Sequence, residues 1–378
     1  MANYDLLVIG TGPAGQKAAV QAAKLGKKVG IIERKAVVGG VCINTGTIPS
    51  KSLREAVLYL SGFRQRNLYG TGYRVKATIT IEDLIFRATH VITNEIRIVQ
   101  DQMRRNHVDM IYGTASFVDQ HRLLVQQASG TVEHTAHFIV IAVGTEPARP
   151  PEIPFDDQSI IDTDALLTLK RIPQSIVIVG GGVIGTEYAS ILATIGVPVT
   201  LIDKRPRLLE FVDAEIIDAL QQQMKDIGVS LYHNEEVVGI QKAANGDVTV
   251  TLQQARPVTT TTLLYAIGRV GASRELNLEQ AGLAADSRGR LTVNEHFQTS
   301  VPHIYAVGDI IGFPALASTS MQQGRHASCH AFGQPDRMDN ALLPYGIYSI
   351  PEISMVGRTE EDLTRANIPV GVGIARYR

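Results

Sequence analysis

The sequence has few cysteines, almost no net charge and no long apolar run. Its two cysteines, Cys42 and Cys329, cannot form a disulfide framework, which is typical of a reducing compartment. The formal net charge of −1 gives no general attraction to nucleic acid or to anionic membranes. No stretch approaches the roughly 18 apolar residues that a membrane span needs, and the early apolar run from Tyr4 to Gly10 leaves no room for a signal peptide. We therefore expect a cytoplasmic protein that binds neither nucleic acid nor membrane.

The length and the glycine content point to more than one nucleotide-binding domain. A chain of 378 residues is long for one core, so two or three domains are expected. Residues 5–32 and 175–202 share one order of elements: an apolar strand, a glycine turn, a helix and a second strand. This repetition predicts an internal duplication. Between the two copies the sequence predicts a helix over 81–105 and a hairpin of 111–118 with 121–125, and the proline-rich stretch 147–154 predicts a domain boundary.

The first glycine turn has the fingerprint G-x-G-x-x-G. Gly10 permits the tight turn, Gly12 lets the backbone approach a pyrophosphate, and Gly15 allows the helix to pack closely on the strand. The start of the helix offers unpaired N–H groups to the phosphates. Glu33 ends the second strand, where a carboxylate can accept hydrogen bonds from ribose hydroxyls. The alternative is a tight turn without a ligand, but the strand, the helix and the acid together favour a dinucleotide site.

The second glycine turn repeats this arrangement. Gly180, Gly182 and Gly185 stand between a strand and a helix, and Asp203 ends the next strand. Asp203 follows Gly180 by 23 residues, the same spacing as from Gly10 to Glu33. Matching spacing in two separate segments predicts two dinucleotide sites.

Three further strand-to-glycine junctions, at Gly144, Gly268-Arg269 and Gly308-Asp309, complete a family pattern. With the two fingerprints, they resemble the two-dinucleotide-binding flavoproteins, in particular the pyridine nucleotide-disulfide oxidoreductase family. The resemblance implies an α/β fold with two Rossmann-like domains, one for FAD and one for NAD(P), and only the start of an α+β interface domain, so that the chain resembles a C-terminally truncated member. It implies an FAD domain at 1–150 and 273–343, an NAD(P) domain at 151–272, and a shortened interface domain at 344–378. Members of the family form homo-oligomers through that last domain.

The resemblance also implies which residues hold each nucleotide. Those expected at FAD are Gly10, Gly12, Gly15, Glu33, Arg34, Gly39, Gly40, Cys42, Lys51, Gly144, Gly308 and Asp309. Those expected at NAD or NADP are Gly180, Gly182, Gly185, Glu187, Asp203, Lys204, Arg205, Gly268 and Arg269.

The segment from Gly39 to Lys51 predicts the reaction. It is similar to the redox segment of the family's disulfide reductases, which has Cys-x4-Cys followed by Pro and Lys, but here the second cysteine position is Thr47. A threonine hydroxyl has no accessible redox chemistry, and the single thiol of Cys42 cannot cycle through an intramolecular disulfide. Disulfide reduction is therefore excluded. Family members with Thr at this position transfer hydride between NADPH and NAD through FAD, with each nicotinamide binding in turn.

The resemblance places Lys51 near the flavin ring and pairs it with Glu187. A cation beside the ring would stabilise negative charge there, and the carboxylate would hold the amine in place. With Thr47 and Cys42, they form the predicted catalytic group; Cys42 is expected to pack beside the flavin without a redox role. The alternative for Lys51 and Glu187 is a solvated helix charge.

The tip after the second acid has mixed charge, Asp203-Lys204-Arg205-Pro206-Arg207. An acid there favours the free ribose hydroxyls of NAD, whereas basic neighbours accommodate the 2′-phosphate of NADP. A mixed tip fits an enzyme that uses both forms, and a solvated basic loop fits equally well.

Other interpretations remain open from the sequence. Electrons could pass to oxygen or quinones, as in an NAD(P)H oxidase or diaphorase, or the chain could be an inactive flavin-binding module. The pair His326 and His330 with Cys329 has helical spacing suited to zinc, but no fourth ligand is evident, so no metal is expected.

Overall fold

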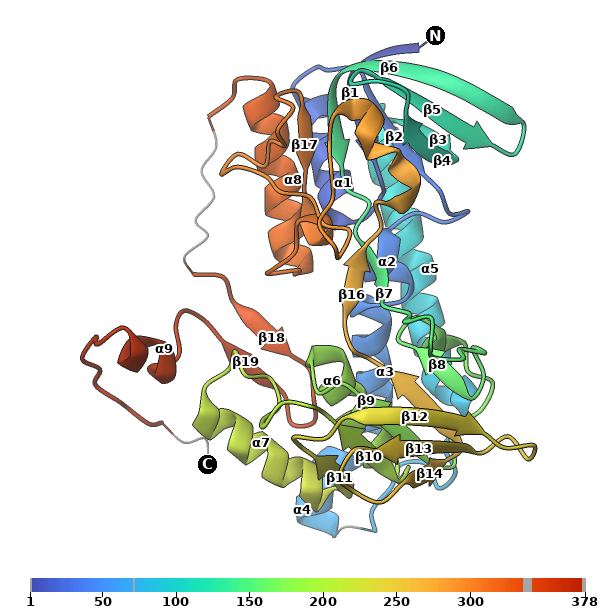
Figure 1. Ribbon diagram of the computed structural model, residues 1–378, viewed down its shortest axis with the longest axis vertical. Helices are drawn as coiled ribbons and strands as arrows, with labels where there is room; N and C mark the ends of the chain where they lie inside the picture. Colours follow the sequence, from blue (N-terminus) through green and yellow to red (C-terminus); the bar gives the residue numbers. More distant parts are fainter. Residues whose placement is uncertain (1, 71, 336–341, 376–378) are drawn as a thin grey trace. The chain divides into compact units, whose positions relative to one another are not determined.

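The computed structural model describes residues 2–70, 72–335 and 342–375 and divides into two compact units (Figure 1). The first unit contains residues 1–56, 81–148 and 269–339, and the second contains 57–80, 149–268 and 340–378. Helix α3 (Thr47–Leu60) begins in the first unit and ends in the second. Part of the predicted segment 273–343, residues 336–341, and the end of 344–378, residues 376–378, lie outside the described residues.

The first unit is built on a sheet with the order β3-β2-β1-β6-β5-β4, to which β17 is added beside β6. Strands β1 (Ala2–Ile9), β2 (Val29–Glu33), β3 (Asp109–Tyr112), β6 (Gly130–Ile141) and β17 (Ile304–Ala306) run parallel. Strands β4 (Thr114–Phe117) and β5 (Arg122–Gln127) continue the sheet antiparallel from β6. A separate two-stranded ribbon joins β7 (Thr145–Pro147) to β16 (Arg269–Gly271).

Alternating side chains bury both faces of this sheet. Leu6 and Val8 of β1 face a core formed with the alanines of α1 (Pro13–Lys24), Met103 of α5 (Ile81–Arg105) and α8 (Ala317–Ala331). Leu7 and Ile9 face the other core, which includes Phe117 and the segment around residues 276–291. Helix α8 packs along α1 (Figure 1). This layering is that of a Rossmann unit.

The predicted strand over 111–118 is wrong in one respect, because it is two strands. Gly113, with φ +156°, ends β3, which pairs with β2, and begins the turn into β4, which pairs with β5. A Cβ at this position would lie 2.5 Å from the Gln126 carbonyl oxygen. The hairpin is therefore β4–β5, while the first part of the predicted strand belongs to the parallel sheet.

The second unit repeats the strand order of the first. Its parallel sheet has the order β11-β10-β9-β15-β8, formed by β8 (Ile160–Asp162), β9 (Ile176–Val179), β10 (Val199–Ile202), β11 (Val229–Tyr232) and β15 (Thr262–Tyr265). An antiparallel sheet of β12 (Val237–Lys242), β13 (Val248–Leu252) and β14 (Val258–Thr260) packs on it through a shared core. The order β11-β10-β9-β15 corresponds to β3-β2-β1-β6 in the first unit, so the predicted duplication and fold class are confirmed.

The remaining elements of the second unit are mostly helical. They are α4 (Arg66–Tyr69), α6 (Val183–Thr194), α7 (Ala214–Asp226) and α9 (Glu360–Arg365), together with the hairpin of β18 (Tyr345–Ile347) and β19 (Ile353–Met355). Residues 57–80 belong to this unit by their contacts, whereas the sequence places all of 1–150 in one domain. The assignment of domains to nucleotides stays a prediction. No helix among the described residues is long and apolar enough to cross a membrane.

Candidate nucleotide-binding sites

The first glycine loop has the geometry that a bound dinucleotide requires. Gly10 has φ +105°, and a Cβ there would lie 2.4 Å from the Ala142 carbonyl oxygen. A Cβ at Gly15 would lie 1.9 Å from the Gly10 carbonyl oxygen. Both positions exclude larger residues because backbone already occupies the space. At Gly12, by contrast, no heavy atom lies within 4 Å of the Cβ position. Packing therefore explains the first and third glycines, and open space remains over the second.

The start of helix α1 is open for an anion. Gly12 is its N-cap, no side chain caps it, and Pro13 begins the helix. The uncapped N–H groups and the helix dipole favour negative charge at this point. Gly40 closes one side of the loop, since a Cβ on it would lie 2.9 Å from the Gly12 Cα. The space suits a pyrophosphate held by backbone N–H groups.

Glu33 is buried at the end of β2 and is tied to the loop by Thr11. Its Oε2 accepts hydrogen bonds from the Thr11 backbone N–H, at 3.2 Å, and from the Thr11 hydroxyl, and its Oε1 accepts from Lys35 N at 2.8 Å. The Thr11 hydroxyl in turn accepts from Gly39 N at 3.0 Å. A carboxylate has about four lone-pair sites, so acceptor capacity remains for ribose hydroxyls. Thr11 thus links the glycine loop to Glu33 at the end of β2 and to the segment that begins at Gly39.

Cys42 lies on the short helix α2 (Gly40–Asn44), and Thr47 stands at the start of α3. Burial raises the pKa of Cys42, and the charges of Asp309 and Glu95 add to this, while Thr47 and Lys51 lower it. The net effect is a raised pKa, so the thiol is neutral at neutral pH and is a poor nucleophile. Neither Cys42 nor Cys329 forms a disulfide, and Cys329 is buried in α8.

Lys51 lies one helical turn after Thr47 on α3, and its Nζ is 3.3 Å from the Ser50 hydroxyl. Residues four apart on a helix share a face, so the predicted cation and Thr47 lie on the same side of α3. Glu187, its predicted partner, is buried on α6 of the second unit, where its Oε1 accepts from Tyr348 N at 2.9 Å. Their pairing stays a prediction.

The Gly308-Asp309 turn lies at the carboxyl end of β17. Gly308, with φ +80°, donates its N–H to Gln323 Oε1 of α8 at 2.8 Å. Burial raises the pKa of Asp309, against the charge of Arg269 and a hydrogen bond with Ser320. A carboxyl group in this setting can hydrogen bond to the hydroxyls of a ribityl chain. Gly324 on α8 permits α1 to approach α8 closely, since a Cβ there would lie 2.0 Å from the Ala14 carbonyl oxygen.

For four of the predicted residues, the structure shows contacts within the protein or a positive φ angle. The Arg34 guanidinium lies 3.2 Å from Glu275 and 3.9 Å from Glu146, and all three side chains are exposed. Arg269, predicted at NAD(P), lies in the first unit, where it donates to the hydroxyl and carbonyl of Thr145 at 2.9 and 3.0 Å. Gly144 and Gly268 have positive φ angles, +65° and +123°. A ligand role for these four stays a prediction.

The second loop reproduces the first. Gly180 has φ +108°, a Cβ there would lie 2.4 Å from the Ala266 carbonyl oxygen, and a Cβ at Gly185 would lie 1.9 Å from the Gly180 carbonyl oxygen. Gly182 has no heavy atom within 4 Å of its Cβ position and is the uncapped start of α6. The two units therefore present the same open helix terminus at the carboxyl edge of a parallel sheet, where open α/β sheets bind ligands.

Asp203 is buried at the end of β10 and is paired with Arg205. Its Oδ1 accepts from Arg205 N and Nε, both at 2.8 Å, and its Oδ2 accepts from Arg205 Nη2 at 2.7 Å and from Gly181 N. Burial raises the pKa of Asp203, but the bonds from Arg205 and Gly181 hold it below its usual value. Arg207 pairs with Asp218 at 3.2 Å, and Lys204 is exposed. Among the basic side chains of the tip, that of Arg205 forms the ion pair with Asp203.

Several residues of these sites were not predicted. Thr11 and Gln323 act through side-chain bonds, and Gly324 through close helix packing. The position of Thr11 inside the fingerprint could have predicted its role, since the fingerprint turn lies beside the acid that ends the next strand. Gln323 and Gly324 are far away in the sequence and carried no signal.

The predicted histidine–cysteine cluster gives no metal site in the part of the chain that the structure describes, where no group of three or more His, Cys, Asp or Glu could hold an ion. Instead, His330 accepts or donates a hydrogen bond at 2.9 Å with the Tyr305 hydroxyl and stacks on His296.

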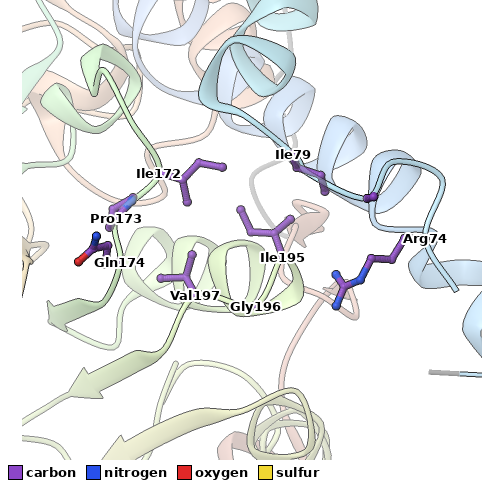
Figure 2. A pocket seen from close by; sticks show the side chains of 9 residues that line it. Arg74, Ile79, Ile172, Pro173, Gln174, Ile195, Gly196 and Val197 are labelled. Carbon is purple, nitrogen blue, oxygen red and sulfur yellow. The ribbon is translucent and has the colours of Figure 1, made fainter. Parts of the chain in front are cut away.

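A cavity of about 250 Å³ lies in the second unit, away from the glycine loop. It is lined by Arg74, Ala77, Ile79, Ile172, Pro173, Gln174, Ile195, Gly196 and Val197 (Figure 2). Residues 172–174 precede β9 and residues 195–197 precede β10. The cavity is thus at the amino edge of the sheet, opposite the edge expected for nucleotides.

The comparisons with known proteins agree with this geometry. Residues 4–324 match the family described as pyridine nucleotide-disulphide oxidoreductase. A soluble pyridine nucleotide transhydrogenase of Mycobacterium bovis is 51% identical over 380 residues, covering 100% of this chain and 81% of the relative. The soluble pyridine nucleotide transhydrogenase of Colwellia psychrerythraea is 44% identical over 381 residues, with the same coverage.

Solved structures show the same fold. The HOCl-induced flavoprotein disulfide reductase RclA from Escherichia coli matches with a TM-score of 0.83 and 31% identity, over 96% of this chain and 79% of that one. LpdA from Mycobacterium tuberculosis matches with a TM-score of 0.88 and 26% identity, over 97% of this chain and 80% of that one. This chain therefore belongs to the pyridine nucleotide-disulphide oxidoreductase family and is an FAD-containing oxidoreductase that uses NAD(P).

Proposed function

We propose that this chain transfers hydride between NADPH and NAD, with FAD held by the first unit and the two nicotinamide dinucleotides binding in turn to the second. The observation that carries the proposal is that Thr47, at the start of α3, stands where the second cysteine would follow Cys42 of α2. A disulfide reductase needs a second sulfur at that place to pass electrons to its substrate. The relatives at 51% and 44% identity are named transhydrogenases, which supports the same activity here.

The residues of the first unit fit FAD. The open N-terminus of α1 at Gly12 suits the pyrophosphate, the buried carboxylate of Glu33 suits a ribose, and Asp309 suits the ribityl hydroxyls. Bound FAD would supply the centre that accepts a hydride from one nicotinamide and gives it to another, which no side chain of this chain can do.

The side chains near Cys42 have supporting roles in this proposal. Lys51 supplies a fixed positive charge on the same face of α3 as Thr47, which stabilises negative charge that develops during transfer. Thr47 supplies no thiol, and the raised pKa of Cys42 keeps its thiol neutral and unreactive. Electrons then have no route to sulfur, and a second nicotinamide is the acceptor that remains.

The tip at Asp203 fits a site that takes both dinucleotides. Arg205 can turn from Asp203 to the 2′-phosphate of NADPH, and the Asp203 oxygens that its guanidinium releases can accept from ribose hydroxyls. We expect Arg205→Ala to raise the KM for NADPH about tenfold and the KM for NADH less than threefold, because one charge-assisted hydrogen bond is lost only with the phosphate. Steady-state kinetics with both substrates checks this, and equal effects on the two would contradict it.

Transfer itself is tested with a spectrally distinct nicotinamide. FAD-loaded protein is mixed without oxygen with NADPH and thionicotinamide adenine dinucleotide, and reduction of the analogue is followed by its own absorbance. We expect rapid reduction of the analogue and no turnover of lipoamide or oxidised glutathione. Thr47→Ser is the matched control, since it keeps the hydroxyl and should keep the rate within about twofold. Oxygen consumption without analogue reduction would instead identify an oxidase, and loss of flavin without turnover an inactive binding protein.

The proposal extends to the cellular compartment in which the protein acts. We propose that the protein works in the cytoplasm, because Cys42 and Cys329 form no disulfide and the relatives are named soluble.

A further inference from the structure

His233 lies at the same edge of the second unit as Asp203. Strands β10 and β11 pair in parallel with Ile202 opposite Tyr232, so the residues that follow, Asp203 and His233, leave the sheet side by side. Backbone bonds hold the two loops together: Asp203 N donates to Tyr232 O at 2.9 Å, and Asn234 N donates to Arg205 O at 3.2 Å. The imidazole is therefore carried on a fixed backbone next to the acid that recognises the ribose.

The His233 ring has an unused hydrogen-bonding atom. Its Nδ1 is buried and has no hydrogen-bond partner among the described residues. Buried polar atoms are nearly always paired, so an exception at the edge of a ligand site requires an explanation. A ligand that binds at Asp203 would supply the missing partner once the ring turns to bring this nitrogen to the surface.

The charges at this edge leave room for one more cation when NADPH binds. Both oxygens of Asp203 already take bonds from Arg205, so that guanidinium offsets the carboxylate. A 2′-phosphate adds a charge of −1.5 to −2 beside them. If Arg205 turns to the phosphate, the Asp203 carboxylate is uncovered next to a second anion. A further positive charge would then stabilise the complex.

The charged groups around the ring set its state before NADPH binds. Burial lowers the pKa of His233, the charge of Asp203 raises it, and Lys225 on α7 lowers it, with a net lowering. Glu235, two residues further on, directs its carboxylate to the N–H groups of Gln254 and Ala255, at 2.9 and 3.0 Å. The imidazole is therefore neutral at pH 7 and able to accept a proton.

We propose that His233 discriminates between the two dinucleotides by taking up one proton when the 2′-phosphate binds and donating a hydrogen bond to it. This rests on the proposed function, because it assumes that the second unit receives both NADPH and NAD. The proton comes from solvent, and it leaves again with the dinucleotide. Binding of the phosphorylated form then weakens as the pH rises, while binding of the unphosphorylated form does not change.

The test uses two ligands that differ only in the 2′-phosphate, ADP-ribose and 2′-phospho-ADP-ribose. Neither carries a nicotinamide, so their binding to FAD-loaded protein does not depend on hydride transfer. Calorimetry between pH 7.0 and 8.5 gives the two Kd values, and buffers of different ionisation enthalpy give the protons taken up. At pH 7 and above, about nine-tenths or more of the phosphate is already ionised, since its pKa is near 6. We expect a proton uptake approaching one at pH 7 for 2′-phospho-ADP-ribose only, and its Kd to rise several-fold over this range.

His233→Gln should remove the effect and leave the site otherwise intact. We expect the variant to bind 2′-phospho-ADP-ribose about tenfold more weakly at pH 7, with no proton uptake and no pH dependence, and to bind ADP-ribose within twofold of wild type. His90→Gln, on the exposed side of α5 in the first unit, is the matched control and should change nothing. Equal weakening of both ligands, or unchanged proton uptake, would overturn the proposal. A protein that shows the binding effect but no hydride transfer would overturn the proposed function alone.

Discussion

At the scale of single residues, Thr47 occupies the position of the second cysteine in the redox segment of the family's disulfide reductases. The side chain of Thr47 lowers the pKa of the Cys42 thiol, which indicates that the two side chains are neighbours. A disulfide needs two Cβ atoms about 3.5–4.5 Å apart. We expect Thr47→Cys to form a disulfide with Cys42 when it is purified without reductant. Thiol titration of the denatured protein should then find one free thiol, that of Cys329, compared with two in wild type.

The thiol count has a matched control. Thr47→Ser introduces no sulfur and should titrate with two thiols. Three free thiols in the Thr47→Cys protein would mean that the two side chains are not aligned as the structure has them.

Sequence alone identified the acids of both sites but not their partners. Glu33 and Asp203 were found because their spacing from the glycines repeats. Each acid is followed by basic residues, yet Arg34 turns away to Glu275, whereas Arg205 binds Asp203 with two nitrogens. Which rotamer an arginine adopts depends on charges brought in from distant segments, and a linear pattern does not contain them.

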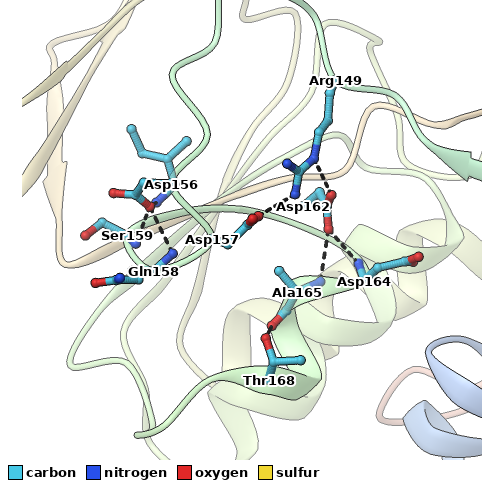
Figure 3. Close-up of polar contacts among 10 residues, drawn as sticks. Arg149, Asp156, Asp157, Gln158, Ser159, Asp162, Asp164, Ala165 and Thr168 are labelled. Atoms are coloured by element: carbon cyan, nitrogen blue, oxygen red, sulfur yellow. Dashed lines mark hydrogen bonds and ion pairs between the residues drawn. The ribbon is translucent and has the colours of Figure 1, made fainter.

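At the scale of elements, the polar loop before β8 shows how a short strand is held at the edge of a sheet. Asp156 Oδ1 accepts from Gln158 N, Ser159 N and Ile160 N at 2.8–2.9 Å, and its Oδ2 pairs with Lys242. Arg149 bridges Asp157 and Asp162, which begins the next turn (Figure 3). These bonds fix the entry into β8 and its register beside β15.

We expect Asp156→Asn to reduce the free energy of unfolding by about 1 kcal/mol at pH 7. Burial raises the pKa of Asp156, but the bonds from Lys242 and from the three N–H groups have a larger, opposite effect. The net result is a pKa of about 2, compared with the usual 3.8. Such a shift corresponds to about 2 kcal/mol, and solvent screening of a partly exposed pair reduces the expected loss. Urea denaturation of both proteins at pH 7 measures the difference.

The same pair should show a defined pH dependence. The folded pKa lies below the unfolded one, so the stabilisation is complete above pH 4–5 and is lost as the pH falls toward 2. The difference between wild type and Asp156→Asn should therefore be constant from pH 8 to pH 5 and shrink below pH 4. A difference that is as large at pH 2 as at pH 7 would mean that the charge is not what stabilises the loop.

At the scale of the whole chain, the sequence predicted the duplication but not the full membership of each unit. Strand, turn and helix periodicity is local, so both parallel sheets could be found. The assignment of residues 57–80 to the second unit depends on long-range contacts, and helix α3 runs through the boundary without any break in its pattern. Gly113 divided a predicted strand for a related reason, since its two sides pair with different partners.

The duplication allows the two nucleotides to be assigned by matched substitutions. Gly12 and Gly182 have φ −65° and −76°, which any residue adopts, and open space where a Cβ would lie. An alanine at either position should cost the empty protein nothing, but its methyl group would intrude where a pyrophosphate approaches the helix. We expect Gly12→Ala to lose most of its FAD on purification, and Gly182→Ala to retain FAD while its Kd for NADH rises at least tenfold. Flavin absorbance and NADH fluorescence titration measure these two quantities.

Substitutions at Gly15 and Gly185, the third glycine of each fingerprint, distinguish an effect on nucleotide binding from an effect on folding. A Cβ at Gly15 or Gly185 would lie 1.9 Å from a carbonyl oxygen of its own loop, so Gly15→Ala and Gly185→Ala must displace backbone and should lower the Tm even without nucleotide. If Gly12→Ala instead kept its flavin and Gly182→Ala lost it, the order of the two sites would be reversed. Because both loops have the same geometry, such a result would leave the fold unchanged and place FAD in the second unit.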